Sequence, residues 1–189
     1  EWAVAHPNQL ERVPDDIDDE SALTTLSSPG LTAYTALDLF GRPSPGQTIA
    51  VTSAAGAVGA FAVQLARIGG MRVIGVAGGA QKCALVTERL GAAACLDYRA
   101  DDFGEALSRA APAGIHLVFD TVGGPVADRL FDHVAQFATV LIVGRSASNN
   151  SATPALDMVN MRQLWARDAR IQCFSRYSYP ERWAFAKTI

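Results

Sequence analysis

Hydrophobic residues in this chain follow two patterns that alternate from about residue 48 onward. The first is a short, continuous apolar run rich in β-branched residues, which predicts a strand buried on both faces of a sheet. Strands of this kind are predicted over 48–52, 73–76, 94–96, 115–119, 139–143 and 171–174.

The second pattern is helical spacing, in which apolar residues recur every three or four positions. Val58, Phe61 and Leu65 show it after the first predicted strand, and a Gly-Gly pair ends that helix. Asp18 is placed to cap an earlier helix. Helices are predicted over 19–26, 31–40, 58–68, 80–90, 103–110 and 153–165. Another helix is predicted to begin at Pro125, with a buried face formed by Val126, Leu130, Phe131 and Val134.

Strands that alternate with amphipathic helices predict a parallel sheet covered by helices on both faces. Right-handed crossover connections then favour the doubly wound arrangement. We therefore expect an α/β fold with a doubly wound, six-stranded parallel sheet of the Rossmann type.

Composition and charge remove several classes of function. The chain has 189 residues, 49% of them hydrophobic, and a formal net charge of −3. This balance gives no reason to expect nucleic acid or a membrane surface as partner, and the apolar runs are too short to span a membrane. Cys83, Cys95 and Cys173 are widely spaced, and no Cys/His cluster has zinc spacing. We therefore expect reduced thiols, a cytoplasmic location and no metal site.

Both ends of the chain indicate a piece of a larger protein. The first residue is Glu1 rather than Met, and 181–189 have the pattern of a helix that stops after its opening turns. We therefore expect a fragment or an excised domain.

The turn after the first predicted strand carries a candidate phosphate-binding loop. Residues 54–59 are Ala-Ala-Gly-Ala-Val-Gly, which matches the dinucleotide-binding fingerprint with Ala54 at the first glycine position. Gly56 would let the backbone approach a pyrophosphate, and Gly59 would let helix and strand pack closely, with free N–H groups at the helix start. The alternative is a plain tight turn that binds nothing. The strand before the loop, and the helix and strand after it, favour dinucleotide binding.

The end of the second predicted strand favours NADP(H) over NAD(H) as the dinucleotide. An NAD site usually has an Asp or Glu there, about 20 residues after the loop, to accept the ribose hydroxyls. Residues 76–82 contain no carboxylate, and Lys82 would attract the 2′-phosphate of NADP(H). The alternative for Lys82 is a solvated lysine in the first turn of a helix.

Several motifs occur together in an order and spacing that one family shares. They are 28–34 (Ser-Pro-Gly-Leu-Thr-Ala-Tyr), the 54–59 loop, 78–82, 96–98 (Leu-Asp-Tyr), 119–124 (Phe-Asp-Thr-Val-Gly-Gly) and 143–144 (Val-Gly). Over nearly its whole length the chain resembles the zinc-free medium-chain dehydrogenase/reductases. The resemblance is to the branch of prostaglandin reductases, plant alkenal double-bond reductases and bacterial curcumin reductase. That branch uses NADPH to reduce the carbon–carbon double bond of α,β-unsaturated ketones or aldehydes, with hydride transfer to the β-carbon.

The resemblance implies cofactor contacts along the first half of the sheet. Lys82 and Tyr98 would contact the 2′-phosphate end of NADP(H). The pyrophosphate would be held by Gly56, Ala57, Val58 and Gly59.

It also implies contacts along the second half. Val143 and Gly144 would lie beside the nicotinamide half, and Phe174 and Ser175 would face the same ring. Thr121 stands where the family usually has Asn, so its polar contact to the cofactor is expected to differ.

Three departures concern the substrate side. Relatives often carry a Tyr-Asn pair shortly after the strand-five glycine, where this chain has Asn149 and Asn150, so a tyrosine-assisted protonation is in doubt and no catalytic residue is assigned. Arg145 and Arg176 would suit an anionic substrate group, and the alternative favoured here is that both are surface arginines.

The family pattern also divides the chain and sets its expected function. Residues 1–26 would end a catalytic-lobe segment, 27–178 would form the dinucleotide-binding domain, and 179–189 would start a following helix. The expected function is NADP(H)-dependent reduction of small α,β-unsaturated ketones or aldehydes by the parent protein. The alternatives are a binding module that is inactive alone and an NADPH:quinone reductase. A homodimer is expected through pairing of the sixth strand, as in relatives.

Overall fold

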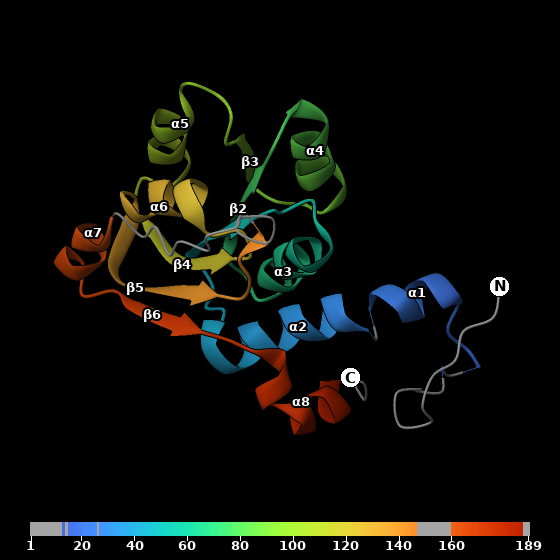
Figure 1. The fold of residues 1–189 in the computed structure, drawn as a ribbon. Helices are drawn as coiled ribbons and strands as arrows, with labels where there is room; N and C mark the ends of the chain where they lie inside the picture. Colours follow the sequence, from blue (N-terminus) through green and yellow to red (C-terminus); the bar gives the residue numbers. More distant parts are fainter. Residues whose placement is uncertain (1–12, 14, 26, 147–159, 187–189) are drawn as a thin grey trace, which may run out of the picture.

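The predicted strands form one parallel sheet in the computed structural model, which describes residues 13, 15–25, 27–146 and 160–186. The strand order is β3-β2-β1-β4-β5-β6, and all neighbours pair in parallel (Figure 1). The order reverses between β1 and β4, which makes that place the topological switch point. The strands are β1 (Thr48–Thr52), β2 (Arg72–Ala77), β3 (Ala94–Asp97), β4 (Ile115–Asp120), β5 (Val134–Ile142) and β6 (Arg170–Cys173).

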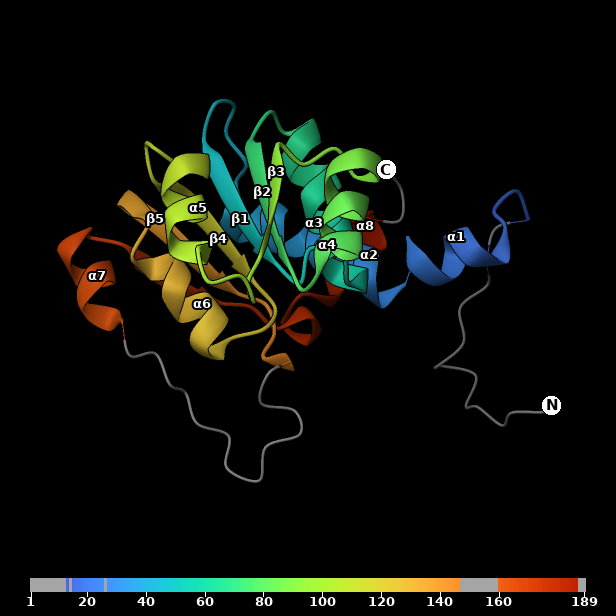
Figure 2. The same ribbon diagram turned by 90° about the horizontal axis from the view of Figure 1, so that it is seen from above.

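Helices cover both faces of this sheet, as expected for a doubly wound fold (Figure 2). Ile49 and Val51 of β1 face one core cluster, while Ala50 between them faces the other. The first cluster lies under α2 (Ser28–Ala36), α3 (Ala57–Ile68) and η3 (Leu85–Arg89), which continues α4 (Ala80–Ala84). The second lies under α5 (Phe103–Ala110), α6 (Gly124–Phe131) and α7 (Met161–Ala166).

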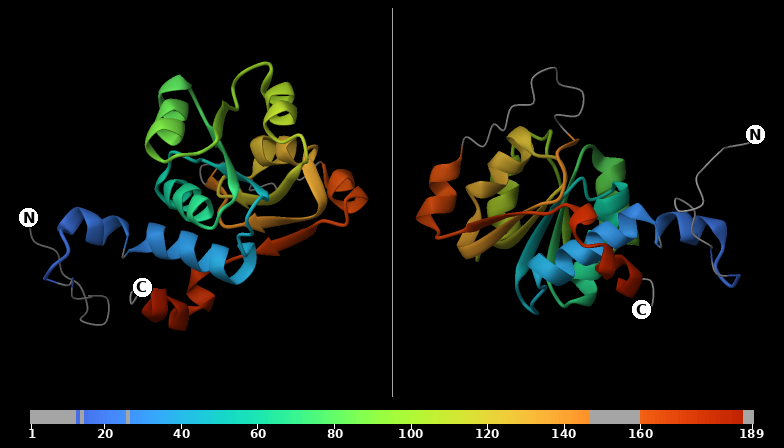
Figure 3. Two further views of the ribbon diagram at one scale, coloured as in Figure 1. Left: turned by 180° about the vertical axis from the view of Figure 1, so that it is seen from behind. Right: turned by 60° about the horizontal axis from the view of Figure 1, so that its bottom comes forward.

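Two further helices lie outside these layers. Helix α1 (Asp19–Thr24) projects away from the sheet in Figures 1 and 2, and the Asp18 carboxylate caps it by accepting the Ser21 N–H at 2.9 Å, as predicted. Helix α8 (Pro180–Ala186) lies beside α2 in both views of Figure 3. An ion pair of 3.4 Å between Arg182 and Asp38 joins α8 to the turn that follows α2.

One strand begins earlier than the sequence predicts. Val134 was expected on the buried face of the preceding helix, but it starts β5 and pairs with Ile115 of β4. The strand was missed here because its first half lacks a continuous apolar run. Gln136 interrupts the run, and Phe137 after it has a left-handed φ of 59° and is 73% exposed.

Other boundaries also differ from the predictions. The helix predicted over 31–40 begins at Ser28, where Pro29 occupies the first turn, and it ends in the π-helical turn η2 (Leu37–Gly41). The helix predicted over 80–90 likewise passes from α4 into the π-helical turn η3. Helix α1, predicted over 19–26, ends at Thr24, and residue 26 lies outside the described residues, as does the start of the helix predicted over 153–165.

Candidate functional site

A hollow of about 400 Å³ opens at the carboxyl ends of β1, β2 and β3, beside the switch point. Ligands of doubly wound sheets bind at this edge, because the strands end there and the helices that follow them begin there. The lining residues are Ser53, Ala55, Gly56, Val76, Ala77, Gly78, Lys82, Tyr98, Arg99, Val122, Val126 and Ser146.

The loop between β1 and α3 has the close packing that its glycines predict. A Cβ atom on Gly59 would lie 2.2 Å from the backbone oxygen of Ser53, so only glycine lets the first turn of α3 approach β1 this closely. Ser53 itself adopts a left-handed φ of 48°, and Gly56 is the N-cap of α3. Gly56 lines the hollow, and the predicted pyrophosphate contacts Ala57 and Val58 belong to the first turn of α3.

The first turn of α3 offers hydrogen-bond donors that the helix itself does not use. The first N–H groups of an α-helix have no carbonyl partner within the helix, and they carry its partial positive charge. In α3 the Ala60 N–H donates to the Gly56 carbonyl at 2.8 Å, which closes the first turn of the helix. No side chain caps this end. The N–H groups of 57–59 are therefore suited to bind a phosphate oxygen.

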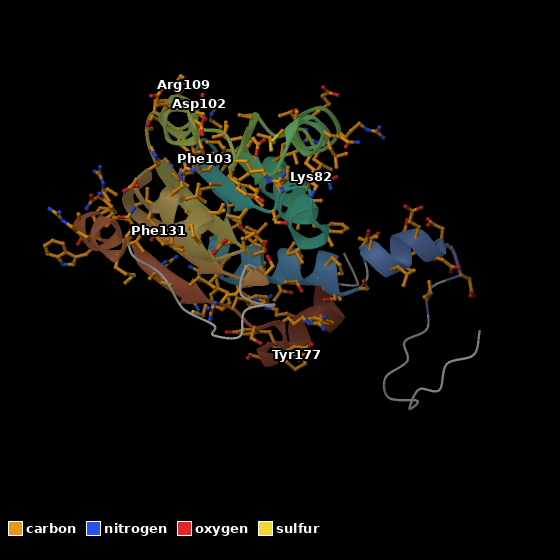
Figure 4. All side chains as sticks on the ribbon, turned by 45° about the horizontal axis from the view of Figure 1, so that its top comes forward. Lys82, Asp102, Phe103, Arg109, Phe131 and Tyr177 are labelled. Carbon is orange, nitrogen blue, oxygen red and sulfur yellow. The ribbon has the colours of Figure 1, made fainter. Side chains whose placement is uncertain are left out.

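A cluster of two cations and one phenol forms the other side of the hollow. Lys82, labelled in Figure 4, comes from α4, and Tyr98 and Arg99 follow directly after β3. Gly78 makes room for the pair, because a Cβ atom there would lie 3.0 Å from Tyr98 Cε1 and 3.1 Å from Arg99 Nε. The Arg99 guanidinium carbon is 5.5 Å from the centre of the Tyr98 ring.

Asp97 fixes the turn that presents Tyr98 and Arg99. Its carboxylate accepts the Arg99 backbone N–H at 3.0 Å. The Asp97 carboxylate accepts hydrogen bonds from the backbone N–H groups of Arg99 and Gly79. These bonds, the one from Arg99 more strongly, lower the pKa of Asp97 below its ordinary value. No acidic residue is among the described residues that line the hollow, so the lining itself presents only positive charge.

Arg99 is a functional candidate that the sequence reasoning missed. The prediction concentrated on the end of the second strand, where the ribose-binding acid of an NAD site would stand. Parallel strands end at one edge, so the residues after β3 reach the same hollow as those after β2. The dipeptide Tyr98-Arg99 after a predicted strand was the signal that would have found it.

At the switch point a buried carboxylate ties β1 to β4. Asp120 is 3% exposed and accepts the Thr52 hydroxyl at 2.7 Å. It also accepts the backbone N–H groups of Val122 and Gly123, both at 3.0 Å. The network orders the turn after β4, and the sequence reasoning gave Asp120 no role.

Thr121, predicted to contact the cofactor, takes part in the same network. Its N–H donates to the Thr52 hydroxyl at 2.9 Å, and its own hydroxyl donates to the Thr52 carbonyl at 3.3 Å. The N–H groups of Val143 and Gly144 donate to the Asp120 carbonyl at 2.7 and 3.1 Å. These three predicted residues therefore lie together at the carboxyl ends of β4 and β5, and their cofactor contacts stay predictions.

Phe174 and Ser175 follow β6. The Phe174 ring is 8% exposed and packs between Phe40 and Tyr179, with ring centres 6.0 and 5.9 Å away. Ser175 is exposed. The structure uses the Phe174 ring in the core, and the contact of either residue with a nicotinamide ring stays a prediction.

The two arginines considered for an anionic substrate differ in their surroundings. The Arg176 guanidinium stacks on Tyr177 and Trp183, 4.5 and 4.7 Å from the ring centres. Arg145 is half-buried beside Gly123. Asn149 and Asn150 lie outside the described residues.

The described residues contain neither a metal-ligand cluster nor a helix that could span a membrane. No group of three His, Cys, Asp or Glu side chains gathers there as ligands of a metal ion would. None of the described helices combines the length and hydrophobicity that a membrane span requires.

Comparison with known proteins gives a consistent result. The family described as zinc-binding dehydrogenase matches residues 57–187. The NADPH-dependent curcumin reductase of Escherichia coli (strain K12) is 39% identical over 152 residues, which are 80% of this chain and 44% of that protein. Prostaglandin reductase 1 of Bos taurus is 35% identical over 183 residues, which are 94% of this chain and 55% of that protein.

A solved structure has the same fold over nearly the whole chain. CurA from Vibrio vulnificus, crystallised in complex with NADPH, superposes with a TM-score of 0.80 and 32% identity, covering 95% of this chain and 55% of that one. The chain spans about half the length of the curated relatives that it matches.

Proposed function

Because this chain belongs to the medium-chain dehydrogenase/reductase family, in the zinc-free branch of the curcumin and prostaglandin reductases, we propose that it binds NADP(H) for an oxidoreductase. We further propose that the parent protein reduces the carbon–carbon double bond of α,β-unsaturated ketones or aldehydes. The named relatives in the branch and the order of the sequence motifs support this substrate class.

One observation carries the cofactor proposal. The free N–H groups at the start of α3 and the side chains of Lys82, Tyr98 and Arg99 converge on a single hollow that no carboxylate lines. A dinucleotide with a 2′-phosphate carries negative charge at two places, the pyrophosphate and the ribose phosphate. Helix N–H groups suit the first, and two cations with a phenol suit the second. An acid, which would favour NAD(H), is missing from the lining.

The residues divide the task of holding the cofactor. Gly56, Ala57, Val58 and Gly59 would bind the pyrophosphate through their backbone, and Lys82, Tyr98 and Arg99 would bind the 2′-phosphate. When bound, NADPH supplies the hydride for the reduction. The turns that Asp120 orders, with Thr121, Val143 and Gly144, would support the nicotinamide half. Their backbone positions are fixed before binding, so little ordering cost falls on the complex.

The division of the chain and its assembly are part of the proposal. Residues 1–26 would belong to the lobe that completes the substrate cleft, 27–178 to the cofactor domain and 179–189 to a following helix. In the described part of the sheet β6 pairs with β5 alone, and Ile171 on it is 37% exposed. An apolar edge strand of this kind favours pairing with the same strand of a second copy.

Turnover by the full-length parent tests the substrate proposal. With NADPH deuterated at the transferred position, an enone or alkenal should give a saturated product that carries deuterium on the β-carbon. Lys82→Gln in the parent should raise the KM for NADPH and leave kcat unchanged, whereas Arg109→Gln, on the distant helix α5, should change neither value. Oxidation of NADPH with quinones but not with enones would instead assign the quinone-reductase alternative. Cofactor binding without turnover of either substrate would favour a binding module.

A further inference from the structure

Two of the three cysteines lie in α4 and β3, the elements that carry the cationic residues of the hollow. Cys83 is in α4, Cys95 is in β3, and both are half-buried free thiols. The Cys83 thiol is near enough to act on Cys95, because it contributes to raising the pKa of the Cys95 thiol. Helix α4 packs directly against β3, so the two elements that carry the cysteines are neighbours in space.

The packing around Gly75 of β2 explains how the two thiols come together. A Cβ atom at Gly75 would lie 3.2 Å from Cys95 Sγ and 2.6 Å from Val86 Cγ1. The missing side chain therefore lets Cys95 and Val86, which lies one helical turn after Cys83, pack on the same face of β2. Cys173, by contrast, is exposed on β6, at the opposite edge of the sheet.

The cysteine pair joins the two elements that carry the charged lining. Lys82 precedes Cys83 in α4, and Tyr98 and Arg99 follow Cys95 within four residues at the end of β3. A covalent bond between the sulfurs would therefore link the two sides of the site assigned to the 2′-phosphate.

We propose that Cys83 and Cys95 form a redox-sensitive dithiol, which a hydroperoxide converts to a disulfide that weakens NADPH binding. The second half of this proposal rests on the proposed cofactor site, and the first half does not.

The chemistry balances with the peroxide as the oxidant. The Cys83 thiolate attacks one peroxide oxygen, the O–O bond breaks, and the products are a sulfenic acid on Cys83 and water or an alcohol. The Cys95 sulfur then attacks the Cys83 sulfur. The S–S bond forms, the S–O bond breaks, and hydroxide leaves with the Cys95 proton as water. Two electrons pass from the two thiols to the peroxide.

The surroundings fix the order of the two steps. Burial, and after it the neighbouring Cys83 thiol, raise the pKa of the Cys95 thiol far above its ordinary value. Cys95 therefore stays protonated when the peroxide arrives, and Cys83 is the thiol that reacts first.

The disulfide should displace Lys82. A disulfide holds its sulfurs about 2.05 Å apart, which is closer than two thiols in contact. Ladder pairing from Ile74–Ala94 to Ala77–Asp97 holds β3 to β2. The approach must therefore come from α4, whose first turn contains Lys82.

The experiment uses the full chain with Cys173→Ser, which leaves the pair as its only cysteines. After titration with hydrogen peroxide, thiol counting and mass spectrometry of a digest under non-reducing conditions should show two thiols lost and a peptide pair joined through Cys83 and Cys95. The Kd for NADPH should rise about tenfold on oxidation, which corresponds to one lost charge-assisted contact, and dithiothreitol should restore it. Cys83→Ser and, separately, Cys95→Ala should abolish both changes, and circular dichroism checks that each variant is folded.

Different results would overturn the dithiol and its effect on NADPH binding. A sulfenic or sulfinic acid on Cys83 with no joined peptides would overturn the dithiol. Joined peptides with an unchanged Kd for NADPH would overturn its effect on binding. If the reduced chain does not bind NADPH at all, the proposed cofactor site fails, and the peptide map still decides whether the dithiol exists.

Discussion

Two hollows of similar size lie at opposite ends of the sheet, about 400 Å³ at the carboxyl ends of β1 to β3 and about 350 Å³ at the amino ends of β4 and β5. The second contains Ser108, Asp132, His133 and Arg167 among its lining residues. Both are therefore lined by polar side chains, and their volumes do not distinguish them. The difference between them lies in which ends of the helices they meet.

At the carboxyl edge α3 begins, with unused N–H groups and two nearby cations. At the amino edge α5 and α6 end, and Asp132 is the C-cap of α6. Helix N-termini attract anions and C-termini repel them, so only the first hollow is suited to a dinucleotide. The comparison teaches that the direction of the helices, more than polarity or volume, identifies the candidate site.

The largest effect should come from adding one methyl group at the start of α3. Gly59→Ala places a Cβ atom 2.2 Å from the Ser53 oxygen and 2.8 Å from its carbonyl carbon. Both are backbone atoms, so α3 must move off β1, and we expect the free energy of unfolding to fall by about 3 kcal/mol and NADPH binding to be lost. Denaturant unfolding and calorimetric titration measure the two quantities.

Gly104→Ala is the matched control for this change. Gly104 lies in α5 with no atom within 4 Å of its added Cβ, so alanine should stabilise the chain by up to about 1 kcal/mol. Equal stabilities of the two variants would show that α3 does not need its close approach to β1.

The Asp120 network should have the next largest effect. Asp120→Ala leaves the Thr52 hydroxyl and the N–H groups of Val122 and Gly123 without their acceptor, which should cost about 3 kcal/mol or slightly less of unfolding free energy. Asp102→Ala is the control, because its ion pair with Arg109 on α5 (Figure 4) is 3.0 Å long but its side chain is 59% exposed. That variant should lose less than about 0.5 kcal/mol. Similar losses would contradict a structural role for the switch-point carboxylate.

Charge removal at the carboxyl-edge hollow should have a smaller effect, confined to one cofactor. Lys82→Gln and Arg99→Gln should each raise the Kd for NADPH about tenfold and leave the Kd for NADH unchanged, because only NADPH carries the 2′-phosphate. Arg109→Gln should change neither constant. A parallel weakening of NADH binding would place these cations near the pyrophosphate instead.

The smallest effect should come from His133 in the amino-edge hollow, where its Nδ1 lies 3.4 Å from the Ser108 hydroxyl oxygen. Burial lowers the pKa of His133 below its ordinary value. The unfolded chain therefore binds this proton more readily, so the contribution to stability is complete above about pH 6.5 and is lost as the pH falls through the folded-state pKa. His133→Gln should flatten that part of the stability profile without changing the Kd for NADPH. A loss of NADPH affinity in this variant would contradict the separation of the two hollows.

The sequence predicted the sheet well because its central strands have no polar side. Apart from His116, residues 48–52 and 115–119 are apolar or β-branched, since helices cover these strands on both faces. The start of β5 could not be found in this way. Its first residue, Val134, pairs through the backbone with β4, and Phe137 is exposed. The spacing of hydrophobic residues does not indicate which backbone segments pair.

The candidate site was predicted where local spacing carries the information. Gly56, Gly59 and Lys82 belong to segments whose neighbours in sequence are also their neighbours in space. Arg99 and Asp120 were missed because their roles depend on which strands end side by side. The cysteine pair was missed for the same reason, since Cys83 and Cys95 meet only when β3 pairs with β2.

Calorimetric titration of this chain with NADPH and, separately, with NADH tests the central claim most directly. The account predicts that NADPH binds much more tightly than NADH, and that the difference shrinks as salt screens Lys82 and Arg99. Equal affinities for the two cofactors, at low and at high salt, would contradict it.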